Sequence, residues 1–125
     1  MTADEGSAVS ASDQLRVLFR IWVTREFYAA PADEQAQVFK AIPPAFDRLG
    51  ERFGVTVLGT LDEDLLQVGT GAREPISYVL ADAPDLAAVR TVCEIVRTER
   101  VGEFPLWRYL EIDARIGHEL FFATH

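Results

Sequence analysis

The chain has 125 residues, the length of one domain, and its 49% hydrophobic and 26% charged residues are ordinary for a globular protein with a single core. Its net charge of −8 disfavours nucleic-acid phosphates and anionic membrane surfaces as partners, because both attract an excess of Lys and Arg. One cysteine and two histidines exclude an internal disulfide and the common zinc-ligand spacings.

The N-terminal segment has neither the basic start nor the apolar stretch of a secretory signal. Residues 1–13 are small, polar and acidic, so we expect a disordered lead-in there and one domain over residues 14–125. No stretch reaches the ~18 apolar residues that a membrane span needs. We therefore expect a cytoplasmic protein.

A strand is predicted from Leu15 to Val23, where apolar residues alternate with other types. One side of this strand is purely apolar and is assigned to the core: Leu15, Val17, Phe19, Ile21 and Val23. The other side carries two arginines and a tryptophan: Arg16, Leu18, Arg20, Trp22 and Thr24.

An amphipathic helix is predicted next. Pro31 suits the first helical position, and apolar residues then recur every three or four positions: Val38, Phe39, Ile42, Phe46, Leu49 and Phe53. Pro43-Pro44 interrupts this stripe, which predicts a kink or two abutting helices. Gly54 is the expected C-cap.

Two further strands are predicted over residues 55–61 and 76–83. The acidic run Asp62-Glu63-Asp64 is interpreted as a solvated turn rather than a cation site, because it lacks EF-hand spacing. Residues 65–68 are interpreted as an extension of this hairpin. Gly69-Thr70-Gly71 is interpreted as a loop, because it lacks the Lys of a phosphate-binding loop.

A second helix is predicted to begin at Pro84-Asp85 and to end at Gly102, with one apolar stripe: Leu86, Val89, Cys93 and Val96. The last strand is predicted from Trp107 to Ile116. Its apolar side is Leu110, Ile112, Ala114 and Ile116, and its other side is Trp107, Tyr109, Glu111, Asp113 and Arg115. The apolar tail over residues 120–122 needs a docking partner.

The resulting order, β-α-β-β-α-β, is that of a ferredoxin-like α+β fold: a four-stranded antiparallel sheet with two helices on one face. In this topology we expect the first and last strands to be neighbours at the centre of the sheet. Their outward sides then place two tryptophans and a tyrosine on the uncovered face, which monomers rarely leave in water. A second copy packed against this face would cover it, with Arg16 and Arg20 pairing with Glu111 and Asp113 across the strands.

Two runs resemble the closing half of the darcynin-type proteins, which belong to the dimeric α+β barrel group. They are ADAPDLA from Ala81 to Ala87, followed by a short helix, and FPLWRYLEI from Phe104 to Ile112. The opening half, a strand with an internal aromatic residue and a helix interrupted at proline, is also similar. Val89 and a longer loop before Ile76 depart from the family pattern. The resemblance implies a dimeric ferredoxin-like fold but no particular reaction, because the wider group includes cofactor-free oxygenases, polyketide cyclases, dehydratases and haem-using enzymes.

The best site candidates lie on the side of the sheet that the helices leave open. The candidate catalytic residues are Arg20, Tyr109, Glu111 and Asp113, and the candidate substrate-binding residues are Trp22, Leu18, Tyr78 and Trp107. An acid–base pair there would move a proton while Arg20 steadies a developing oxyanion, and a flat aromatic substrate would stack on a tryptophan. Alternatively, the charges form a structural ion-pair layer between two copies.

Other reactive residues have competing interpretations. His118 is a general base, a haem ligand, or a solvated or structural histidine. Cys93 is interpreted as a small buried thiol rather than a nucleophile, because no activating His lies near it in the sequence. No metal and no cofactor are expected, with haem as the alternative.

The sequence thus predicts a homodimeric, cofactor-independent enzyme of the oxygenase, cyclase or isomerase type. Its substrate would be a hydrophobic, aromatic or polyketide-like molecule of a biosynthetic or catabolic pathway. The alternatives are a non-catalytic small-molecule-binding accessory protein and a purely structural dimerisation module, since one fold hosts many functions.

Overall fold

Four long strands form one antiparallel sheet in the structure, a computed structural model that describes residues 14–71 and 74–122. The strands are β1 (Leu15–Val23), β2 (Thr56–Asp62), β3 (Ser77–Ala83) and β6 (Leu110–Gly117), in the order β2-β3-β1-β6. The predicted lead-in, residues 1–13, lies outside the described residues.

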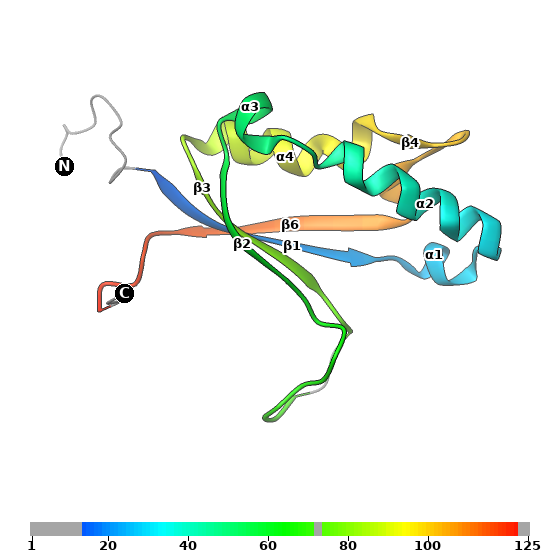
Figure 1. Cartoon of the computed structure of the whole chain (residues 1–125), viewed down its shortest axis with the longest axis horizontal. Helices are drawn as coiled ribbons and strands as arrows, with labels where there is room; N and C mark the ends of the chain where they lie inside the picture. Colours follow the sequence, from blue (N-terminus) through cyan, green and yellow to red (C-terminus); the bar gives the residue numbers. More distant parts are fainter. Residues whose placement is uncertain (1–13, 72–73, 123–125) are drawn as a thin grey trace.

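Helices cover only one face of this sheet (Figure 1). The short helix α1 (Arg25–Ala29) directly follows β1, and the covering layer is α2 (Ala32–Ala45), α3 (Leu49–Phe53) and α4 (Leu86–Thr98). The predicted α+β class with a four-stranded antiparallel sheet is confirmed, and the element order is compatible with a ferredoxin-like fold. The predicted place of the last strand is wrong, because β6 lies at an edge while β1 and β3 occupy the centre.

The core lies between the sheet and the helices. Val17 and Phe19, on the apolar side of β1, are at most 1% exposed, as the alternation predicts. Helix α4 presents a buried stripe to the sheet: Ala88, Val89, Val92, Ile95 and Val96. Leu86, predicted on that stripe, is about half exposed, and Cys93 is only partly buried.

The proline pair of the first helical region lies at the end of α2. Pro31 precedes α2 as its N-cap, and Pro43 and Pro44 lie in its last turn, so the helix ends at Ala45, directly after the pair. A separate helix, α3, follows and ends at Gly54, whose φ of 75° lies in the left-handed region that glycine adopts without a steric cost. A kink or two abutting helices were predicted at the proline pair. The structure has two helices, with the break after Ala45, and the predicted Gly54 cap is confirmed.

The segment after α4 differs most from the prediction. The helix ends at Thr98, and Gly102, with φ of 62°, turns a small hairpin of β4 (Arg100–Val101) and β5 (Phe104–Pro105). A 3-10 helix, η2 (Leu106–Arg108), then precedes β6. Residues 65–68 are loop and do not extend the β2–β3 hairpin. No helix in the described ranges is long and apolar enough to cross a bilayer.

The buried side of β1 makes a direct test of this core. Phe19→Ala is expected to lower the free energy of unfolding by about 3–5 kcal/mol, because it removes a large side chain from a packed site and leaves a cavity. Phe39→Ala, at a 60% exposed position of α2, is the matched control and is expected to cost less than about 1 kcal/mol. Urea unfolding measures both values, and equal losses would contradict the assignment of the core.

Candidate functional site

The open face, defined as the side of the sheet away from the helices, carries side chains in rows that cross the strands. One row contains Leu61, Tyr78, Arg20 and Asp113, in the order of the strands. The next row contains Gly59, Leu80, Leu18 and Arg115. The strand register thus brings apolar side chains from β1, β2 and β3 together beside two arginines, Arg20 and Arg115.

Two ion pairs cross this face. The Arg20 guanidinium binds Asp113 through two bonds, Nε to Oδ1 at 2.9 Å and Nη2 to Oδ2 at 2.6 Å. Arg16 Nε donates to Asp82 Oδ1 at 2.7 Å. The predicted pairing of Arg20 with an acid is confirmed for Asp113, whereas Arg16 pairs with Asp82, the residue opposite it on β3.

The Arg20 pair constrains the chemistry of Asp113. The hydrogen bonds from Arg20 lower the pKa of Asp113 below its ordinary value of 3.8, against a smaller opposing effect of burial. Asp113 therefore stays ionised at neutral pH and accepts from Arg20 with both oxygens. This arrangement suits a structural pair better than a proton donor or a general base.

Glu111 and Trp22 form a second contact between β1 and β6. Trp22 Nε1 donates to Glu111 Oε1 at 2.8 Å, and the Arg20 guanidinium lies 5.8 Å from the centre of the Trp22 ring. Arg20 is therefore held by Asp113 on one side and lies within cation–π distance of Trp22. Trp22, Arg20, Glu111 and Asp113 are brought together as predicted.

Tyr109 does not lie on the open face. It is 0% exposed in the core on the helix side, and its hydroxyl makes a short contact with Glu34 of α2. Burial, and then the Glu34 contact, raise the pKa of Tyr109 above 10.0. The predicted position is wrong because residues 106–108 form the 3-10 helix η2 and not the start of a strand. Side chains there do not alternate between the two faces of the sheet, so Tyr109 does not share a face with Glu111.

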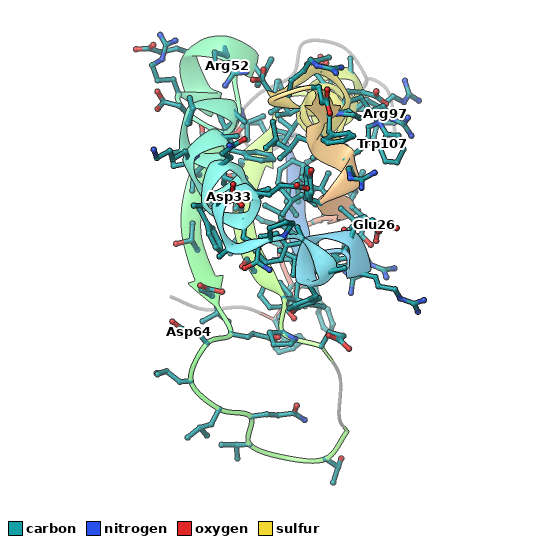
Figure 2. The ribbon with its side chains drawn as sticks, turned by 90° about the vertical axis from the view of Figure 1, so that its right-hand side faces the viewer. Glu26, Asp33, Arg52, Asp64, Arg97 and Trp107 are labelled. Atoms are coloured by element: carbon teal, nitrogen blue, oxygen red, sulfur yellow. The ribbon has the colours of Figure 1, made fainter. Side chains whose placement is uncertain are left out.

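Trp107 belongs to the edge of the sheet rather than to the open face. It lies on η2, is 53% exposed, and is seen near Arg97 of α4 in Figure 2. Two hollows of about 680 and 540 Å³ meet there and share Trp22, Trp107 and Glu111. Charged side chains from α1, η2 and α4 line much of both hollows, among them Arg25, Arg108 and Arg97.

A largely apolar hollow lies on the open face and is called here the open-face groove. Its volume is about 500 Å³, and its lining comes from the first three strands and the turn after β2: Leu18, Gly59, Thr60, Leu61, Glu63, Tyr78 and Leu80. Leu18 and Tyr78 were predicted as substrate-binding residues, and both line this groove. It lies next to Arg20 in the register but is separate from Trp107.

Glu63 is the site residue that the sequence analysis missed. Its Oε1 accepts from the Ile76 backbone N–H at 2.9 Å, and its Oε2 accepts from the Tyr78 hydroxyl at 3.0 Å. Glu63 therefore fixes Tyr78 at the end of the groove instead of facing water in a turn. Gly59 was a possible signal, because a glycine inside a strand often marks a close approach or a bulge, and the register of β2 shifts there.

The remaining reactive side chains lie outside the open-face groove. His118 follows β6 in an exposed segment. Cys93 is half-buried on α4, and burial raises the pKa of its thiol above 9.0, which favours the protonated form. Within residues 14–71 and 74–122, no three His, Cys, Asp or Glu side chains gather closely enough to hold a metal ion.

The Arg20–Asp113 pair predicts a specific dependence of stability on pH. Because the folded-state pKa of Asp113 is lowered, its contribution is present above the unfolded-state value and is lost as pH falls through the folded-state value. Between about pH 5 and pH 2, wild-type protein is expected to lose more stability than Asp113→Asn, measured by urea unfolding at each pH. Asp64→Asn, in an exposed loop, is the control that keeps the wild-type slope. Identical slopes for wild type and Asp113→Asn would refute the pairing.

Comparisons with known proteins do not assign the chain to a family. No family model, curated protein or solved structure matches the chain. The resemblance to darcynin-type proteins remains a prediction from short motifs, and a functional hypothesis has to rest on the chemistry of the open face.

Proposed function

We propose that this chain binds a hydrophobic, aromatic small molecule in the open-face groove. The observation that carries the proposal is the composition of the groove: apolar side chains from three strands form its floor, and a hydrogen-bonded tyrosine stands at one end. Binding sites for small molecules typically combine an apolar lining with a few convergent polar groups. The groove's volume of about 500 Å³ falls in the range of such sites.

The polar end of the groove gives the ligand an orientation. Tyr78 is held by Glu63, and Arg20, next to Tyr78 in the same row, is held by Asp113. Both groups are fixed before a ligand arrives, so binding orders few side chains. A flat molecule with one hydroxyl or carbonyl group fits this pattern, with its ring over Leu18 and Leu80 and its oxygen towards Tyr78.

We further propose that the protein works as a homodimer in which a second copy covers the open face, as in a dimeric α+β barrel. The exposed apolar side chains of this face, among them Leu61 and Leu80, support this arrangement. A single sheet face with an open apolar groove would bury too little of a ligand for tight binding, because ligand sites enclose most of their ligand's surface. The resemblance to darcynin-type proteins points to the same assembly.

A second candidate function is cofactor-independent acid–base catalysis at the same place, of the cyclase, isomerase or oxygenase type. The observation that favours it is the Tyr78–Glu63 hydrogen bond at the end of the groove, 3.0 Å long. The Tyr78 oxygen can take a proton from a ligand while its own proton passes to the Glu63 carboxylate, and the reverse transfer gives a proton back to the ligand, so that both groups end in their starting states. Asp113 is less suited to this role, because both its oxygens accept from Arg20.

Gly59 provides a test of ligand binding that removes no existing contact. A Cβ built on Gly59 meets nothing within 4 Å, so Gly59→Phe is expected to fill the groove without displacing a neighbour. The affinity for the neutral aromatic probe Nile red, followed by fluorescence, is expected to fall at least about tenfold, since the ring and the probe compete for one volume. Gly117→Phe, also in open space but outside the groove, is the matched control and is expected to retain binding.

Catalysis can be separated from binding at Tyr78. Mass spectrometry of molecules that co-purify with the protein would identify a ligand, which is then incubated with each variant. Tyr78→Phe is expected to keep the affinity for it within a few-fold but to lower its turnover by about 100-fold or more, the usual contribution of a positioned acid. Tyr28→Phe, on the exposed surface of α1, is the control. Recovery of the unchanged molecule from wild-type protein would leave ligand binding as the function.

A further inference from the structure

Residues 63–71, which follow β2, form an arm that projects away from the helices, on the side of the open face (Figures 1 and 2). Its base is firmly tied: Glu63 accepts from the Ile76 N–H and the Tyr78 hydroxyl, and Ser77 Oγ donates to Asp62 Oδ1 at 2.9 Å. These bonds fix the direction in which the arm leaves the sheet.

The tip of the arm carries apolar side chains that its own subunit does not cover. Leu65 is 90% exposed, Leu66 is 82% exposed and Val68 is 90% exposed. Gln67 Nε2 bonds back to the Thr70 and Gly71 carbonyls, so the polar side chain closes the turn while the apolar ones face outward. Burying a leucine of this kind is worth about 1.5–3 kcal/mol, so a surface that covers the tip gains substantially.

The open-face groove is the apolar surface that lies on the same side of the molecule as the arm. Its end, at Leu61 and Tyr78, is the base of the arm, so the tip already extends beyond it. The exposure of the tip residues means that the arm does not fold back over its own groove. In a pair of molecules related by a two-fold axis, by contrast, each arm can reach over the groove of the other.

Charge makes a second copy of this chain a suitable partner for the open face. The chain as a whole carries −8, which opposes association of two copies. The open sides of β1, β3 and β6, however, carry equal numbers of both signs: Arg16, Arg20 and Arg115 with Asp82, Glu111 and Asp113. Two of the arginines are already paired within the subunit. The strand part of this face is therefore neutral, and of the surface proposed to meet a second copy only Glu63 and Asp64 in the arm add net negative charge.

We propose that the arm of a second copy lies on the open face and adds Leu65 and Leu66 to the wall of the open-face groove. The site is then incomplete in one subunit, and each subunit encloses the ligand site of the other. As a claim about the ligand site, the inference rests on the function proposed above; as a contact between copies, it can be tested separately. A stable interface of this kind needs about 800 Å² from each partner, which the face and the arm together must supply.

The test is the assembly state of an arm variant, measured by sedimentation velocity over a range of concentrations. Leu65→Asp/Leu66→Asp is expected to raise the dissociation constant of the dimer by about 100-fold or more, because two carboxylates per arm replace buried leucines. Leu86→Asp changes an exposed leucine on the helix side and is expected to leave the dimer unchanged. Circular dichroism checks that each variant is folded.

A mixing experiment tests whether the arm of one copy contacts the groove of the other. Leu80→Asp damages the groove and leaves the arm intact, whereas the arm variant has the opposite defect. A mixture of the two is expected to dimerise more strongly than either alone, because one intact arm then meets one intact groove. If the mixture gains nothing, the arm of one copy does not contact the groove of the other and the proposal is overturned.

Other outcomes also decide the matter. A wild-type monomer at all concentrations, or an arm variant that dimerises like the wild type, overturns the proposal. So does a dimer lost in Phe121→Asp/Phe122→Asp but kept in the arm variant, because the exposed tail would then be the contact. Nile red binding to Gly59→Phe is read separately. If that variant binds like the wild type while the arm variant is monomeric, the ligand site fails and the contact between copies stands.

Discussion

The constraint on which the rest of the structure depends is that its helices cover only one face of the sheet. The strands β1, β3 and β6 then each have one side against the core and one side without a helix above it, whereas the edge strand β2 is exposed along its whole length. On β1 the covered side is Val17 and Phe19, and the open side is Arg16 and Arg20. A register slip of one residue would exchange these sides and place arginines in the core. The ion pairs to Asp82 and Asp113 can form in this register only. Because partly exposed ion pairs add little stability, their main effect is to favour this strand register over a shifted one.

The same pairs restrict what the open face can do chemically. Arg20 offers its Nε and one Nη to Asp113 and lies within cation–π distance of Trp22, so its position is set before any ligand binds. It can orient a ligand oxygen but is not a free charge. Proton transfer, if it occurs, falls to groups whose bonds can be exchanged with a ligand, and the Tyr78–Glu63 bond at the end of the groove is the best placed of these.

Sequence patterns predicted the regular parts of this fold well. They failed where a short irregular element interrupted the alternation of side chains between the two faces of the sheet. The alternating pattern from Leu15 to Val23 predicted both ends of β1 correctly. The same reasoning placed Tyr109 on the wrong side, because a three-residue 3-10 helix before β6 carries no periodic signal. Glu63 was missed for another reason. Its partners, Ile76 and Tyr78, lie 13 and 15 residues further along the chain, and local patterns do not contain such contacts.

The β2–β3 hairpin unites two features that would otherwise be independent. Its strands supply Leu61, Gly59 and Tyr78 to the groove, and its turn supplies the arm. Glu63 stands at the junction and binds both, one oxygen to the Ile76 backbone at the base of the arm and the other to the Tyr78 hydroxyl. The direction of the arm and the polar end of the groove therefore cannot change separately. In the ligand site and dimer proposed above, a ligand that competes for the Tyr78 hydroxyl and a partner that presses on the arm would act on one carboxylate. Binding and assembly would then each influence the other through Glu63.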